Sequence, residues 1–260
     1  MNSEDISWER YPGVANHQHA CTWLTIQCQL QLAKNTIDAY ARALEAFLHF
    51  CYREQIIINE ANRGDIARYV HHLSHVPRPD HHPGQPEHGL ANATIQQRLT
   101  AIRLYYDYLM EEGIRENNPV GRGRYTPGNA FGGQRDRGLL PRFRKLPWIP
   151  GEEEWERIIA VTRQEPVRNR IMFALSYDAA LRREELCLLE TGDIDPTRRL
   201  VQVRAETTKN RQGRVVPYTA STAALYVNYL NHRRDLSHER GPLFLSESRR
   251  NHAQPISIWT

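Results

Sequence analysis

Hydrophobic residues recur at helical spacing along much of the first half of the chain. In the segment 35–51 they return every three or four positions, as one buried face of a helix requires. Asn35 or Thr36 can cap the start of this helix. The segment 93–113 repeats the pattern, and Gly113 suits a helix C-terminus. The sequence therefore predicts amphipathic helices over both segments.

A further helix is predicted from Asn62, and the segment 77–89 that follows it contains four prolines and two glycines, which indicates a loop. The pair Asn118-Pro119 ends the helical pattern. We therefore expect a polar N-terminal tail over 1–22 and a helical domain over 23–119.

The pattern changes after a Gly-rich segment, 120–147, which we interpret as a linker to a second domain over 148–260. Short strands are predicted in LVQVRA and RVVPYT, on either side of a polar turn. Helices are predicted in four stretches of this domain, which are PGEEEWERIIAVT, PVRNRIMFALSYDAA, Leu181–Leu189 and STAALYVNYLNHRRD.

Composition narrows the class of protein. The 260 residues are 40% hydrophobic and 25% charged, as in a globular domain. No apolar run is long enough to span a membrane, and the polar N-terminus does not resemble a signal peptide. The cysteines are scattered without metal-site spacing, which predicts reduced thiols in a cytoplasm; they are Cys21, Cys28, Cys51 and Cys187.

The net charge of +4 decides little, but its distribution is uneven. The segment 121–147 holds seven basic residues and one acidic residue. Such a segment is either a solvated linker or a strap that lies along phosphates.

The sequence ALRREEL places two arginines and two glutamates in an apolar frame. On a helix over 181–190, Arg182 and Glu185 share the apolar face, while Arg183 and Glu184 point away. Two interpretations follow from this geometry. Either an inward ion pair completes the core, or Glu185 orients Arg182 beneath an anionic ligand, for which the planar guanidinium is suited.

Two motifs together resemble the tyrosine recombinase, or phage integrase, family. AALRREELCLLETGDID resembles the family's first active-site box, although Ala180 stands where a glycine is usual. TTKNRQGRVVPY resembles its hairpin, in which a lysine in the turn precedes a basic residue and VP. The resemblance implies that Arg182 is the first catalytic arginine, Lys209 the hairpin lysine and Glu185 an acidic support residue.

The resemblance covers nearly the whole chain and implies a fold. That fold is mainly α with a small antiparallel β-sheet: a four-helix SAM-like core-binding domain, then a partial integrase-type catalytic domain. ATIQQRLTAIRLYYDYL resembles the helix that such domains lay in the DNA major groove, which implies contacts from Thr94, Gln97 and Arg98. The helical wheel favours another face instead. The remaining candidates for DNA contact are, for that face, Gln96, Thr100 and Arg103, then Lys34, Thr36 and Arg42, and in the linker Arg142, Arg144 and Lys145.

Members of this family cut one DNA strand with a tyrosine, which becomes joined to the 3′ phosphate. No metal or other cofactor is implied, and the expected partners are double-stranded DNA and other protomers in a synaptic tetramer. The family's H-x-x-R box and nucleophilic tyrosine have no counterpart after Lys209. The only H-x-x-R, His75–Arg78, lies in the Pro-rich loop. We therefore expect a C-terminally truncated recombinase that does not cleave DNA alone.

Three other interpretations remain. A chain without the nucleophile can be a non-catalytic DNA-binding protein that occupies recombination sites. A metal site is a second, but the spacing fits no standard site; the histidines concerned are His71, His72, His75, His81, His82 and His88. A nucleotide-binding loop at GRGRYTPG is a third, and it lacks the spacing of known phosphate loops.

Overall fold

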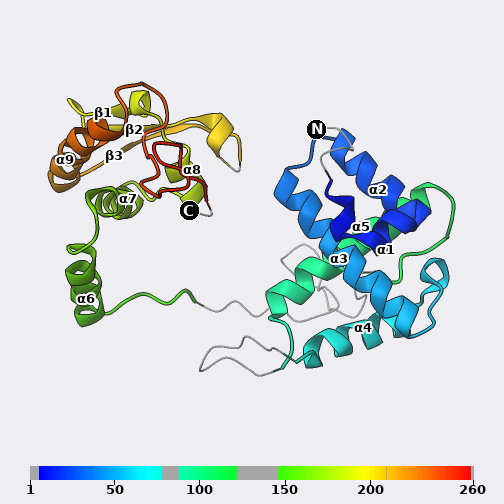
Figure 1. Cartoon of the computed structure of the whole chain (residues 1–260). Coiled ribbons are helices and arrows are strands. Elements are labelled where there is room, and N and C mark those ends of the chain that lie inside the picture. Colours follow the sequence, from blue (N-terminus) through cyan, green and yellow to red (C-terminus); the bar gives the residue numbers. More distant parts are fainter. Residues whose placement is uncertain (1–5, 78–87, 122–145, 209, 259–260) are drawn as a thin grey trace, which may run out of the picture. The chain divides into compact units, whose positions relative to one another are not determined.

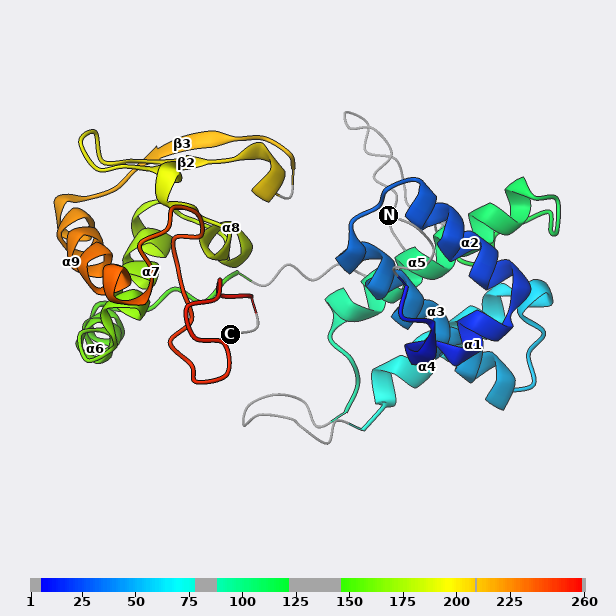
Figure 2. The same ribbon diagram turned by 45° about the horizontal axis from the view of Figure 1, so that its top comes forward.

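The computed structural model describes residues 6–77, 88–121, 146–208 and 210–258. The chain divides into two compact units, Met1–Leu146 and Pro147–Thr260. Figures 1 and 2 show a helical first unit and a second unit in which helices pack beside a small sheet. The predicted linker residues Arg142, Arg144 and Lys145 lie outside the described residues.

The first unit is built from helices. Its elements are η2 (Trp8–Arg10), α1 (Pro12–Asn16), α2 (Gln18–Gln29), α3 (Lys34–Arg53), η3 (Ile58–Glu60), α4 (Arg63–His75) and α5 (Asn92–Glu111). Asn62 caps α4 by accepting hydrogen bonds from the amides of Gly64 and Asp65. Gly113 has a φ of +69°, as expected after the end of α5.

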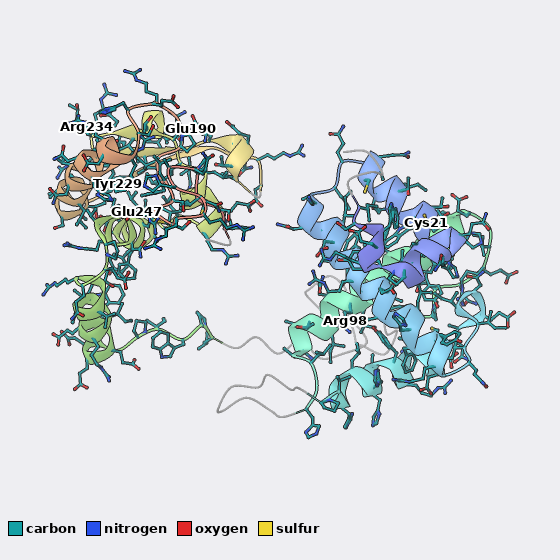
Figure 3. The ribbon with its side chains drawn as sticks, viewed as in Figure 1. Cys21, Arg98, Glu190, Tyr229, Arg234 and Glu247 are labelled. Atoms are coloured by element: carbon teal, nitrogen blue, oxygen red, sulfur yellow. The ribbon has the colours of Figure 1, made fainter. Side chains whose placement is uncertain are left out.

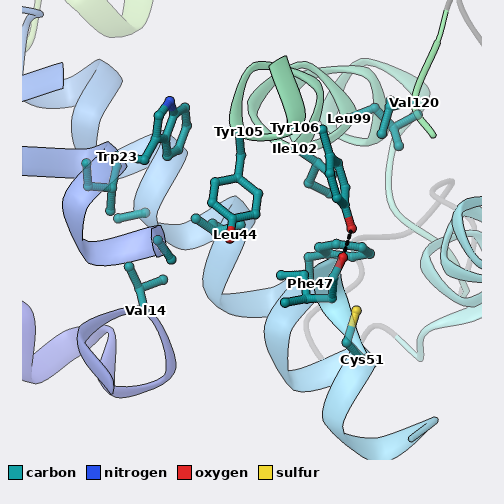
Figure 4. Close-up of a cluster of buried hydrophobic side chains, with 14 of the residues drawn as sticks. Val14, Trp23, Leu44, Phe47, Cys51, Leu99, Ile102, Tyr105, Tyr106 and Val120 are labelled. Carbon is teal, nitrogen blue, oxygen red and sulfur yellow. Dashed lines mark hydrogen bonds between the residues drawn. The ribbon is translucent and has the colours of Figure 1, made fainter. Parts of the chain in front are cut away.

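The core of this unit lies between α3 and α5 (Figure 4). Leu44 and Phe47 of α3 and Ile102 and Tyr105 of α5 are fully buried. The apolar periodicity of both helices therefore predicted the packing correctly. The predicted cap of α3 was wrong, because the helix begins at Lys34 after Ala33, which makes no side-chain cap hydrogen bond.

The segment predicted as an N-terminal tail is folded from residue 6 onward. Val14 is fully buried in the core, and Glu45 of α3 accepts hydrogen bonds from the amides of Gly13 and Val14, at 2.9 and 2.8 Å. A carboxylate at the first turn of α1 satisfies two amides that have no partner within the helix. Few apolar positions in this segment contact the core, so the hydrophobic pattern of the sequence did not predict that the segment docks on α3.

The second unit combines helices with a three-stranded antiparallel sheet in the order β1-β2-β3. Its elements are α6 (Glu152–Thr162), α7 (Val167–Asp178), α8 (Arg183–Cys187), η4 (Thr191–Asp193), β1 (Ile194–Asp195), β2 (Leu200–Val203), η5 (Ala205–Thr207), β3 (Arg214–Pro217) and α9 (Ala220–Leu236). The two predicted strands are β2 and β3, paired with Val201 opposite Val216.

Helices α7 and α9 pack together and form the core of this unit with the sheet and the segment that follows α9. Ile171 of α7, Tyr229 of α9 and Phe244 are fully buried. Asp178, at the end of α7, accepts hydrogen bonds from the amide and hydroxyl of Thr219 at the start of α9. The predicted fold class, mainly α with a small antiparallel sheet, is confirmed.

Candidate functional site

The N-terminus of α8 differs from the helix predicted over 181–189. The helix covers only Arg183–Cys187, and Arg182 precedes it in an extended conformation. Arg182 therefore does not share a buried face with Glu185. The Arg182 side chain is 58% exposed, and that of Glu185 is 1% exposed.

A strained turn delivers Arg182 to this position. Ala180, between α7 and α8, has a φ of +47°. An L-residue with a Cβ adopts this left-handed conformation at an energetic cost that glycine avoids. The position at which the sequence departs from the usual glycine is thus one where the backbone favours glycine.

Glu185 binds two arginines. Its Oε1 accepts hydrogen bonds from Arg182 Nη1 at 2.7 Å and Arg214 Nη1 at 3.0 Å. Its Oε2 accepts from the Arg182 amide at 2.9 Å and Arg214 Nη2 at 2.7 Å. The Arg214 guanidinium, helped by the amide and guanidinium of Arg182 and opposed by burial, lowers the pKa of Glu185 to about 2. The carboxylate is therefore ionised at neutral pH.

Arg214 was not singled out from the sequence, where it is only the basic residue before VVP. Its strand carries a usable signal. Along β3, half-buried Arg214 and Val216 alternate with exposed Val215 and Pro217. Because alternate residues of a strand share a face, the pattern places Arg214 on the inner side with Val216.

Lys209 lies outside the described residues, but its neighbours hold the turn between β2 and β3. Thr208 is buried, its hydroxyl donates to the Ala205 carbonyl at 2.9 Å, and it accepts from the Gln212 amide at 2.9 Å. Arg211 has a φ of +52°. The turn is therefore fixed on both sides of position 209.

Three tyrosines follow the hairpin, and all are buried. Tyr229, labelled in Figure 3, donates a hydrogen bond to the Leu243 carbonyl at 2.9 Å. Burial raises the pKa values of Tyr218, Tyr226 and Tyr229. Each hydroxyl is thus harder to ionise than an exposed phenol.

The candidate DNA contacts on α5 fall on one ridge and its flanks. Gln97 and Thr100 are exposed. The half-buried residues divide between the two sides: Thr94 and Arg98 on one flank, Gln96 and Arg103 on the other. The two competing faces thus overlap at the exposed ridge, because each supplied one of its residues.

The flanks of α5 have different neighbours. Arg98, labelled in Figure 3, lies near Tyr69 of α4. Burial raises the pKa of Tyr69 to about 12, and the charge of Arg98 partly offsets this effect. On the other flank, the Asn118 side chain donates to the Arg103 carbonyl and to Asp107. The loop after α5 therefore contacts the helix on the flank that carries Arg103.

The candidates on α3 lie in its N-terminal half. Lys34 is exposed and Thr36 is half-buried. Arg42 pairs with Asp38, which also accepts hydrogen bonds from Arg10 and Tyr11. Part of the charge of Arg42 is thus offset within the protein.

Comparison with known proteins identifies the two units. Residues 151–259 match the model of the phage integrase family, and residues 23–113 match that of the phage integrase N-terminal SAM-like domain. This chain belongs to the tyrosine recombinase family. The resemblance seen in the two motifs is thereby confirmed.

Several tyrosine recombinases are similar in sequence. That of Thermosipho africanus is 25% identical over 229 residues, which are 87% of this chain and 69% of the relative. The XerC recombinase of Xanthomonas axonopodis pv. citri is 27% identical over 193 residues, 72% of this chain and 57% of the relative. That of Stutzerimonas stutzeri is 31% identical over 182 residues, 70% and 54% respectively. The chain thus spans about half to two thirds of these recombinases.

Solved structures share the fold. The Tn1549 transposon integrase in complex with a circular intermediate DNA has a TM-score of 0.61 at 15% identity, covering 91% of this chain and 73% of that one. XerH recombinase bound to its difH substrate has a TM-score of 0.55 at 16% identity, covering 81% and 56%. This likeness extends the recombinase fold to both units.

The histidines do not form a metal site in the described part of the chain. Among those residues, no three His, Cys, Asp or Glu side chains gather closely enough to hold a metal ion. His71 and His75 stack on each other, and His72 stacks on Phe50. His81 and His82 lie outside the described residues. None of the described helices is long and apolar enough to cross a membrane.

Proposed function

We propose that this chain is the DNA-binding and phosphate-activating part of a site-specific DNA recombinase. The observation that carries the proposal is the exposed Arg182 held at the start of α8 by buried, ionised Glu185. A guanidinium fixed in this way can hold the non-bridging oxygens of a phosphodiester before they gain charge in the transition state. The partner in this proposal is double-stranded DNA.

The proposed reaction needs three groups. A tyrosine oxygen attacks phosphorus, and the bond to the 5′ oxygen breaks, which leaves a 3′-phosphotyrosine and a free 5′ hydroxyl. Arg182 stabilises the phosphorane charge, and Lys209, in the turn between β2 and β3, donates the proton that the 5′ oxygen takes up. Reversal with another strand rejoins the DNA, so that no metal or high-energy cofactor enters the scheme.

The same proposal holds that this chain does not cleave DNA alone. The tyrosines after the hairpin are buried with raised pKa values, and Tyr229 is engaged with a backbone carbonyl. None of them suits the role of nucleophile. The tyrosine and the H-x-x-R box would have to come from outside these 260 residues, and other protomers are the proposed partners in synapsis.

The N-terminal unit would then hold the duplex. The exposed ridge of α5, with Gln97 and Thr100, is proposed to face the groove, and the flanking Thr94, Gln96, Arg98 and Arg103 to face bases or phosphates. Lys34, Thr36 and Arg42 of α3 are proposed as further phosphate contacts. So are Arg142, Arg144 and Lys145 of the 120–147 linker between the two domains, 23–119 and 148–260.

Selection from a pool of randomised duplexes tests the proposal. The chain is expected to enrich a defined sequence, and the logarithm of the binding constant should fall linearly with the logarithm of salt concentration. A nicked duplex carrying that sequence then tests cleavage. Salt-independent binding contradicts the DNA-binding role, and a covalent protein–DNA adduct contradicts the inability to cleave.

A second candidate function is a non-catalytic DNA-binding protein that occupies recombination sites. The observation that favours it is that the three tyrosines after the hairpin are buried, while the Arg182–Glu185–Arg214 cluster is intact. If this candidate holds, Arg182→Gln weakens binding no more than loss of any single phosphate contact. Addition of a recombinase that cleaves the same selected sequence should then give competition and no joint product.

A further inference from the structure

Three residues form a closed charge cluster at the start of α8. Arg182 and Arg214 both donate to Glu185, and four hydrogen bonds saturate its two oxygens. Two guanidinium groups against one carboxylate leave the cluster with a formal charge of +1. Because Glu185 is 1% exposed, this charge can reach an anion only through the arginines.

The arginines are not equivalent. The Arg182 side chain is 58% exposed and that of Arg214 is 32% exposed. Arg214 grips both carboxylate oxygens with two nitrogens, whereas the Arg182 guanidinium uses one nitrogen on one oxygen. Arg214 thus donates most of the guanidinium hydrogen bonds to the carboxylate. Arg182 keeps N–H donors and solvent access for a ligand.

Arg214 also reaches Glu185 from a distant part of the chain. It is the first residue of β3, opposite Val203 of β2, immediately after the turn that contains position 209. The ladder between β2 and β3 fixes its backbone (Figure 2). The hydrogen bonds to Glu185 therefore connect the turn end of this hairpin to the start of α8.

We propose that Arg214 is a positioning residue for Arg182. By neutralising Glu185, Arg214 leaves the positive charge of Arg182 available to a phosphate oxygen, and it holds the turn end of the hairpin at a set distance from that arginine. This inference rests on the proposed role of Arg182 as a phosphate ligand. Without Arg214, the pair Arg182–Glu185 is neutral and attracts an anion weakly. Lysine cannot replace the two-nitrogen grip.

A merely structural ion pair makes a different prediction. If Arg214 only closes the core, its loss lowers stability and leaves the charge at Arg182 irrelevant. Removing Glu185 as well would then lower stability further, because a second partner is lost. If Arg214 acts through charge, removing Glu185 as well restores the charge of +1 and should restore binding.

The test uses the full 260-residue chain and a 30-base-pair duplex, and compares salt-dependent binding of Arg182→Gln, Arg214→Gln, Arg214→Lys and the pair Arg214→Gln with Glu185→Gln. Arg198→Gln, in the exposed turn between β1 and β2, removes one charge elsewhere in the same unit. We expect Arg182→Gln and Arg214→Gln each to reduce the salt slope by about one. The double variant should regain the slope. Arg214→Lys should fall between wild type and Arg214→Gln.

Nuclear magnetic resonance gives a readout without DNA. In the wild type, the Arg182 guanidinium signals should report one hydrogen bond to Glu185 and otherwise exposed nitrogens, and the Glu185 carboxyl should titrate well below the usual range for glutamate. In Arg214→Gln, the pKa of Glu185 should move toward the usual range, and the Arg182 signals should change because Arg182 becomes the main partner of the carboxylate. An Arg182 spectrum unchanged by Arg214→Gln overturns the inference, as does a binding loss that Glu185→Gln does not rescue. If the wild type shows no salt-dependent binding, the proposed function fails, and the NMR arm alone decides the positioning role.

Discussion

Arg182 Nη1 lies 2.7 Å from Glu185 Oε1, with the carboxylate side chain almost wholly buried and the arginine more than half exposed. The hydrogen bonds to Glu185 stabilise the second unit fully only while its carboxyl group is ionised. The pair therefore links the candidate site to the acid stability of the domain.

The first prediction concerns acid unfolding. The pKa of Glu185 is lowered from 4.5 to about 2, so its contribution to stability is fully present above about pH 4.5. It is lost as the pH falls toward 2, by roughly 3 kcal/mol from the linkage between pKa and stability. Hydrogen exchange of amides in 183–218 at pH 6, 4 and 2.5 measures this loss. Glu185→Gln should remove this part of the acid dependence, and equal acid dependence in both proteins would contradict the prediction.

A second prediction follows from the turn before Arg182. Ala180→Gly should stabilise the second unit by about 1 kcal/mol, because glycine adopts a φ of +47° without the Cβ clash. Urea unfolding followed by hydrogen exchange in this unit measures the change. Ala179→Gly is the matched control: Ala179 is buried with a φ of −99°, so that glycine there should destabilise. A gain in stability from Ala179→Gly, or a loss from Ala180→Gly, would contradict the inference that the backbone is strained at Ala180.

Arg233 carries a third prediction. It is buried at the end of α9, and its guanidinium donates to the carbonyls of the loop after the helix. Those acceptors are Ser237, Glu239, Pro242 and Leu243. Arg233→Met should lower stability by roughly 3 kcal/mol, because one buried and three part-buried carbonyls lose their donor.

Arg234 provides the control for that experiment. It is exposed on the same turn of α9, and Figure 3 labels it at the surface of the unit. Arg234→Gln removes the same charge but should change stability by less than about 0.5 kcal/mol. If the melting transitions of the two variants coincide, charge near the helix end explains the effect and the hydrogen bonds do not.

Long apolar periodicity made α3, α5 and the overall class predictable. Ile95 and Ile102 of α5 are buried, as the stripe requires, because a repeat of three and four positions over twenty residues fits only a helix. Short elements were less readable. The helix at α8 has five residues, and its start depends on the amide of Arg182 binding Glu185, which no pattern of apolar residues reports.

The candidate site was also predictable from the sequence only in part. Arg182 and Glu185 lie three positions apart, so their pairing could be read from local spacing. Arg214 pairs with Glu185 across 29 residues, and only the fold of β2 and β3 brings them together. Long-range contacts between polar residues leave little trace in one sequence, because neither partner alone departs from the pattern of its own element.

The last prediction concerns the N-terminal segment that docks on α3. Glu45→Gln should open residues 6–16, because an amide nitrogen would replace one of the two oxygens that accept from the Gly13 and Val14 amides. A donor facing a donor leaves a buried amide without a partner, which costs about 2 kcal/mol. Hydrogen exchange of peptides within 6–20 measures the opening. His49, which also contacts Glu45 but is 69% exposed, provides the control, and His49→Ala should leave this exchange unchanged. Equal exchange in Glu45→Gln and wild type would mean that apolar contacts of Val14 and Tyr11 hold the segment without the carboxylate.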